Sequence, residues 1–86
     1  MRPDLIRYLG YLAGTMTVLA FLPQVIRTWK TRRTGDLSMG MFAIIITASA
    51  LWVVYGAVMS DLPIILTNVG MIALNGALAV AKVRYR

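Results

Sequence analysis

The chain contains no cysteine and no histidine among its 86 residues. This absence excludes disulfides and Cys/His metal sites, and we expect no metal and no cofactor. Acidic residues are also scarce, with three against nine lysines and arginines, and charged residues make up only 14 % of the chain. A soluble domain carries about a quarter charged residues. The length allows one domain over residues 1–86, and the mean hydropathy of +0.75 predicts a membrane protein.

Positive charge is confined to three clusters, and the net charge is +6. Nucleic-acid binding requires Lys and Arg spread over one solvated face, so this pattern argues against a nucleic-acid partner. No Lys or Arg lies between the clusters. The clusters are Arg2 and Arg7, then Arg27, Lys30, Arg32 and Arg33, and finally Lys82, Arg84 and Arg86.

The stretches between the clusters predict three membrane-spanning helices. Residues 8–26, 37–60 and 62–81 carry no charge, and each is near the roughly 20 residues that a helix needs to cross the hydrocarbon core. We therefore expect an all-α membrane protein with a basic loop at 27–36 and a basic tail at 82–86. The first stretch is longer than the apolar region of a secretory signal and precedes no cleavage site, so we favour a span over a cleaved signal.

The basic residues also predict the orientation in the cell (inner or plasma) membrane. Seven of the nine Lys and Arg residues lie in the basic loop and the tail, which three spans place on the same side. The turn at 60–63 between the second and third spans has none. Because cytoplasmic segments are enriched in Lys and Arg, we expect the C-terminus in the cytoplasm and the N-terminus outside.

Pro23 and Gln24 stand near the inner end of the first span. Pro23 has no N–H for the carbonyl of Leu19, so we expect the helix to bend there. The amide of Gln24 is a candidate donor near this break, and the pair is equally compatible with the fraying end of a span. Gly10 and Gly14 have the GxxxG spacing, which we interpret as a site of close helix packing.

Turn and cap residues separate the spans. We expect a turn at residues 34–36, in which Gly35 is free to take a positive φ, and Asp36 or Ser38 as the cap of the second helix. We expect Asp61 to cap the third helix, with Pro63 in its first turn, where a missing N–H costs least.

Polar and aromatic residues inside the second and third spans point to a ligand. Ser49, Trp52 and Tyr55 step by three and are expected on one face, although Tyr55 also fits the interfacial aromatic belt. Trp52 lies roughly 12 Å and Asn68 roughly 9 Å below the outer surface. An indole ring and a carboxamide at similar depth suit a small polyhydroxylated ligand. Asn75 is interpreted as a hydrogen-bonding contact between helices. Three helices cannot enclose a ligand, so we expect at least a dimer.

These residues resemble a known family over nearly the whole chain. The Pro23-Gln24 pair, the basic loop, Trp52, and Asn68 sixteen residues later are similar to a bacterial SemiSWEET sugar transporter. SemiSWEETs are the three-helix half-units related to eukaryotic SWEETs and other PQ-loop proteins. The resemblance implies a parallel homodimer of 3+3 helices, in which Trp52 and Asn68 of both protomers bind the sugar.

The resemblance also implies a hinge and two gates for alternating access. These positions are Pro23 and Gln24 for the hinge, Phe21 and Met41 for the cytoplasmic gate, and Tyr55 and Asp61 for the extracellular gate. Members of the family often carry an arginine between the two extracellular gate residues, where this chain has Met59. An Arg–Asp pair is therefore not available at this turn. The resemblance thus does not indicate which contacts close the outer gate.

The leading functional prediction is facilitative uniport of a mono- or disaccharide. Coupled transporters usually need an ionisable group inside the membrane, and Asp4, Asp36 and Asp61 all lie at the ends of spans. Two alternatives stay open: transport of another small polar solute such as an amino acid, and a non-transporting membrane scaffold or accessory subunit. An enzyme is not expected, because no nucleophile, base and orienting group come together in the chain.

Overall fold

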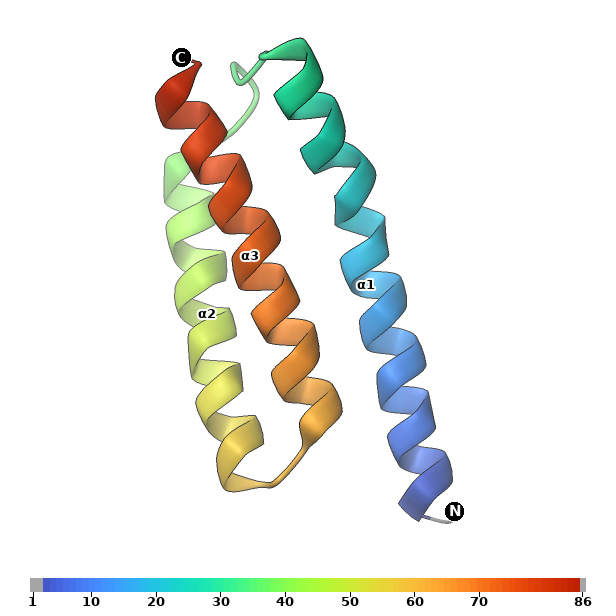
Figure 1. Ribbon diagram of the computed structural model, residues 1–86. Coiled ribbons are helices and arrows are strands. Elements are labelled where there is room, and N and C mark those ends of the chain that lie inside the picture. Colours follow the sequence, from blue (N-terminus) through green and yellow to red (C-terminus); the bar gives the residue numbers. More distant parts are fainter. Residues whose placement is uncertain (1–2, 86) are drawn as a thin grey trace.

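The computed structural model describes residues 3–85, which form three helices and no strand. α1 spans Pro3–Thr31, α2 spans Met39–Val58 and α3 spans Leu62–Arg84. Each of these helices is long and apolar enough to cross a membrane. The chain therefore has the predicted all-α membrane architecture, drawn in Figure 1. Two basic residues of the clusters, Arg2 and Arg86, lie outside the described residues.

The three helices lie side by side with α3 between the other two (Figure 1). α3 packs against both α1 and α2, whereas α1 and α2 make no close backbone approach to each other. The short turn between Val58 and Leu62 forces α2 and α3 to be antiparallel neighbours, as the sequence indicates. The longer connection after Thr31 lets α1 lie on the far side of α3, parallel to it.

Small residues allow α1 and α3 to approach closely. Gly10 faces Pro63, and an added Cβ there would lie 2.9 Å from the Cβ of the proline. Gly14 faces Thr67, with a corresponding Cβ–Cβ separation of 3.1 Å. Gly70 of α3 in turn faces a valine of α1. The interpretation of the GxxxG spacing as a packing site is therefore confirmed, and the partner helix is α3.

The helix starts follow the predicted caps. The side chain of Ser38 accepts a hydrogen bond from the backbone N–H of Met41 at 3.1 Å, so Ser38 and not Asp36 caps α2. Asp61 caps α3 by accepting from the N–H of Ile64 at 3.2 Å. Each cap satisfies one of the N–H groups that a helix start leaves without a carbonyl partner.

Residues 35 and 36 form the expected turn, but Gly35 does not use its freedom to take a positive φ. Among the described residues, φ is positive at Arg32 (59°) and Ser60 (53°) and at no glycine. The reason is where the helices end: Arg32 directly follows the last residue of α1, Ser60 follows the C-cap residue Met59 of α2, and the chain reverses at each. At Ser60 the N–H donates to the carbonyl of Ala57 at 3.3 Å, and the next N–H donates to that of Gly56 at 2.8 Å. This pair of bonds is a Schellman motif without its usual glycine.

α1 extends to Thr31, five residues beyond the uncharged stretch, and its end is tied to α3. The indole N–H of Trp29 donates to the carbonyl of Ala77 at 3.2 Å. The Lys82 ammonium donates to the carbonyl of Thr34 at 2.8 Å, and the Thr34 hydroxyl donates to the carbonyl of Tyr85 at 3.1 Å. The connection between α1 and α2 is thereby fixed to the C-terminal end of α3.

Candidate functional site

Asn68 lines a hollow between α1 and α3. The hollow has a volume of about 270 Å³, and Ala13, Thr17 and Asp61 also line it. The Asn68 side chain is half-buried, and its amide donates to the carbonyl of Ile64 at 2.9 Å. Because this bond uses a donor, the carboxamide oxygen stays available to accept a hydrogen bond from a ligand. No sequence pattern indicated Thr17, whose hydroxyl donates to the carbonyl of Ala13 at 2.9 Å.

Trp52 lies on the exposed surface of α2 beside Tyr55. The two rings meet edge to face, with centroids 5.4 Å apart and an interplanar angle of 83°. Trp52 is 51 % exposed and Tyr55 is 49 % exposed, and both line a shallow hollow of about 400 Å³. Ser49 is buried instead, and only α3 packs against α2. The prediction that Ser49 shares the face of Trp52 and Tyr55 is therefore wrong: the helix turns Ser49 toward α3.

A single protomer does not bring Trp52 and Asn68 into one cavity. They line separate hollows, on α2 and between α1 and α3. Their depth is nevertheless the same. Trp52 lies six residues before the end of α2 at Val58, and Asn68 lies six residues after the start of α3 at Leu62. Six residues correspond to about 9 Å along each helix.

The expected hinge residues and Phe21 lie in the C-terminal half of α1, and Met41 lies in the first turn of α2. The helix continues through Pro23, which is exposed together with Gln24. Within residues 3–85 the Gln24 carboxamide makes no hydrogen bond, so it is not the donor at the proline break. Phe21 is half-buried and Met41 is 48 % exposed.

The expected extracellular gate lies at the turn between α2 and α3. Asp61 is half-buried and is engaged as the cap of α3, and Tyr55 contacts the Trp52 ring. Met59, the last residue before the reversal at Ser60, is 59 % exposed. Within one protomer, Tyr55 lies in the last turn of α2, and Asp61 follows the turn at the end of that helix.

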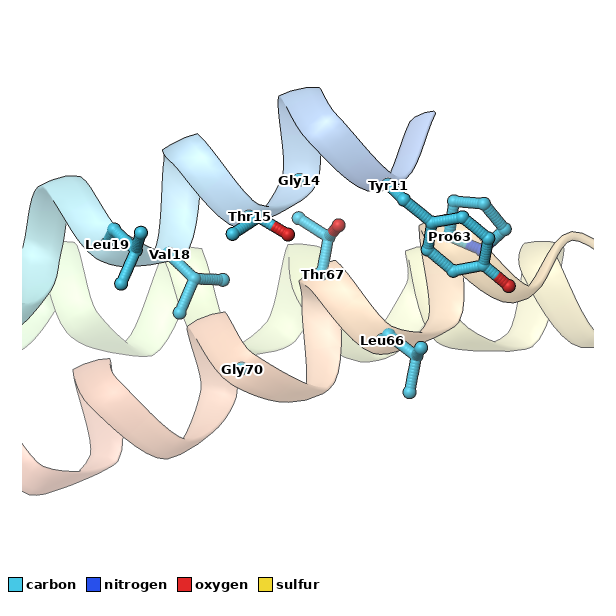
Figure 2. Close-up of a pocket in the computed structure, with 9 residues that line it drawn as sticks. All are labelled: Tyr11, Gly14, Thr15, Val18, Leu19, Pro63, Leu66, Thr67 and Gly70. Carbon is cyan, nitrogen blue, oxygen red and sulfur yellow. The ribbon is translucent and has the colours of Figure 1, made fainter. Parts of the chain in front are cut away.

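A second crevice between α1 and α3 was not predicted from the sequence. Figure 2 shows this crevice. Its volume is about 230 Å³, and it shares Gly14, Pro63 and Thr67 with the Asn68 hollow. Hydroxyl groups of Tyr11, Thr15 and Thr67 are among its lining groups. Its other lining side chains are mainly apolar. Single hydroxyl residues scattered along apolar helices do not indicate such a crevice from the sequence.

The fold and the site define a three-helix membrane protein with half-exposed polar and aromatic side chains on its apolar helices. The family model described as "PQ loop repeat" matches residues 5–65. The chain belongs to the PQ-loop family, among its SemiSWEET members, which confirms the resemblance stated from the sequence.

Relatives and solved structures agree along nearly the whole chain. The chain is 41 % identical over 99 % of both sequences to the sugar transporter SemiSWEET of Bradyrhizobium diazoefficiens. It is 48 % identical to the SemiSWEET of Leptospira biflexa over 71 % of this chain and 72 % of that protein. These relatives are named as transporters and not as enzymes.

Two solved structures have the same fold. A crystal structure of a bacterial homologue of SWEET transporters has a TM-score of 0.91 at 32 % identity, covering 96 % of this chain and 100 % of the other. A SemiSWEET in the inward-open conformation has a TM-score of 0.86 at 31 % identity, covering 94 % and 87 %.

Proposed function

We propose that the protein is a facilitative transporter of a mono- or disaccharide in the cell membrane, working by alternating access as a parallel homodimer. The observation that carries this proposal is the match over 99 % of the chain to a sugar transporter. The half-exposed Trp52 and Asn68 at equal depth support a sugar as the cargo. The indole offers an apolar plate and the carboxamide offers hydrogen-bonding groups.

The homodimer follows from how incomplete the site is in one protomer. The hollows that Trp52 and Asn68 line are each open to one side. In hydrocarbon, an exposed carboxamide oxygen lacks any partner, which is unfavourable. Two parallel copies facing each other across an axis place two indoles and two carboxamides around one cavity. The cytoplasmic basic loop and tail put the N-terminus of each copy outside.

Uniport follows from where the acidic groups lie. Asp4 is in the first turn of α1, Asp36 is in the loop and Asp61 caps α3, so none lies deep in a helix. Proton-coupled transporters use an ionisable group within the membrane, and this chain has no histidine to replace a carboxylate. A proton gradient imposed on liposomes containing only this protein is therefore expected to leave the final sugar level unchanged. Accumulation of sugar above the external level would refute uniport.

Pro23 is well placed to be the hinge. On its outer side, Gly10 and Gly14 hold α1 against α3, and on its inner side Trp29 bonds to Ala77. A bend at Pro23 moves the segment of α1 that follows it and breaks the bond between Trp29 and Ala77, while the glycine contacts stay in place. Phe21 lies two residues before the hinge, and Met41 lies at the start of α2. Pro23→Ala restores the missing N–H and is expected to slow transport. A Pro23→Ala protein that transports as fast as wild type would refute the role of Pro23 as a hinge.

The cargo is tested by competition. Uptake of labelled glucose and sucrose is measured in the presence of a panel of unlabelled sugars, amino acids and other small polar solutes. The proposal predicts that only sugars compete. Competition by amino acids instead would favour the alternative cargo, and absence of any uptake by an intact dimer would favour a scaffold.

A further inference from the structure

Asn75 of α3 carries a buried acceptor without a partner. The residue is 0 % exposed, and its amide donates to the carbonyl of Met71 at 2.9 Å. The carboxamide oxygen of Asn75 accepts no hydrogen bond from the part of the chain that the structure describes. An unpaired buried acceptor is unfavourable, and in a native protein it calls for an explanation. The interpretation of Asn75 as a bond between helices does not supply one, because its hydrogen bond stays within α3.

Asn75 continues the line of Asn68 toward the cytoplasm. Seven residues are nearly two turns, so the two side chains leave α3 within about 20° of each other, and Asn75 lies about 10 Å further in. Both carboxamides make the same bond to the carbonyl four residues earlier, at 2.9 Å in each case. Asn75 therefore lies on nearly the same side of α3 as Asn68, which lines a hollow.

The cover over this part of α3 comes from α1 and α2. Val25 of α1 and Phe42 of α2 form a core cluster with Leu78 of α3, three residues after Asn75. Both α1 and α2 pack on α3, and the cluster that they form with Leu78 lies about one helical turn from the buried Asn75. Val25 is two residues beyond Pro23, on the segment of α1 that a bend at Pro23 would move.

We propose that Asn75 is a second sugar-contacting residue, lying on the cytoplasmic side of Asn68 and uncovered when the inner segment of α1 moves off α3. This inference rests on the proposed sugar transport. A sugar that leaves Asn68 toward the cytoplasm meets the Asn75 oxygen next, and a sugar hydroxyl donates to it. While the path is closed, the Asn75 oxygen has no hydrogen-bond partner. When the path is open, a hydroxyl of the passing sugar supplies the donor.

A single thiol tests this proposal directly, because the chain contains no cysteine. Asn75→Cys is compared with Leu78→Cys, which is equally buried at 1 % exposure on the same helix. Dimers in liposomes are treated with a water-soluble thiol reagent with and without saturating sugar. Asn75→Cys is expected to react about tenfold faster than Leu78→Cys, because it becomes exposed in the open state, and sugar is expected to slow it severalfold. Equal unreactivity of both thiols, or a rate at Asn75→Cys that sugar does not change, would overturn the proposal.

Two further variants separate sugar contact from a structural role. Asn75→Leu removes the unpaired acceptor, so its melting temperature is expected to equal or exceed that of wild type while uptake falls about tenfold. Asn75→Gln keeps a carboxamide and is expected to restore much of the uptake. Ser49→Ala, another buried polar-to-apolar change, serves as the control and is expected to transport like wild type. A lower melting temperature in Asn75→Leu together with unchanged uptake per folded dimer would show a purely structural residue.

The outcome also distinguishes this inference from the proposed function. Wild-type protein that takes up no sugar would refute the proposed function itself. Wild-type protein that transports sugar, with a thiol at position 75 that sugar does not protect, would refute only the role of Asn75.

Discussion

The contact between Gly10 and Pro63 gives a stability prediction whose size follows from the structure. In Gly10→Ala the new Cβ would lie 2.9 Å from the Cβ and 3.2 Å from the Cγ of Pro63. The proline ring is part of the α3 backbone and cannot rotate away, so the helices must separate locally, at a cost of about 1–3 kcal/mol. The higher helix propensity of alanine offsets about 1 kcal/mol of this. The net loss of stability is thus about 0–2 kcal/mol.

Gly76→Ala is the matched control for this change. Both glycines lie inside helices, so both substitutions have the same gain in propensity, but a Cβ at Gly76 meets no atom within 4 Å. Gly76→Ala should therefore be stabilised by about 1 kcal/mol. The difference in the free energy of unfolding between the two variants measures the α1–α3 contact, and we expect it to be about 1–3 kcal/mol. The assay is unfolding in mixed micelles with increasing SDS, followed by circular dichroism. Equal stability of Gly10→Ala and Gly76→Ala would refute the close packing of α1 on α3.

Three further substitutions test single contacts. Trp29→Phe keeps an aromatic ring but removes the bond to Ala77, so unfolding should be easier by about 0.5–1.5 kcal/mol; unchanged stability would mean that the bond contributes nothing. Ser60→Gly relieves a side chain at positive φ and should stabilise the protein by about 1 kcal/mol in the same assay; destabilisation would contradict the Schellman geometry. Asp61→Ala should lose about 1 kcal/mol with the cap, whereas Asp61→Asn should keep it. If Asp61→Asn lowers transport without lowering stability, the negative charge of Asp61 acts in the extracellular gate.

The sequence was sufficient to predict the three helices and the cap of α3, and it narrowed the cap of α2 to Asp36 or Ser38. Uncharged stretches between basic clusters mark the spans because an ionised side chain is costly in hydrocarbon. The cap residues Ser38 and Asp61 follow from local chemistry, since a short side chain before a helix reaches the free N–H groups. The GxxxG pair predicted a close contact because absent side chains leave room for a backbone.

The arrangement of the helices and the turn geometry could not be predicted in the same way. Apolar residues surround α1 and α2 on nearly all sides, so no stripe indicates which neighbour each helix faces. Arg32 and Ser60 take the left-handed conformation because the helices end just before them, against the preference of that conformation for glycine. The unpaired oxygen of Asn75 depends on which side chains cover it, and no local pattern encodes that cover.

The sugar site is a prediction that requires two chains, and the most direct test is uptake. Labelled monosaccharide and disaccharide are followed into liposomes containing wild type, Trp52→Ala or Asn68→Ala, with the dimer content of each checked in parallel. The account predicts that both variants remain dimeric and lose uptake by about tenfold or more, since each removes a contact with the sugar worth at least about 1.4 kcal/mol. Wild-type uptake by both variants in intact dimers would contradict it.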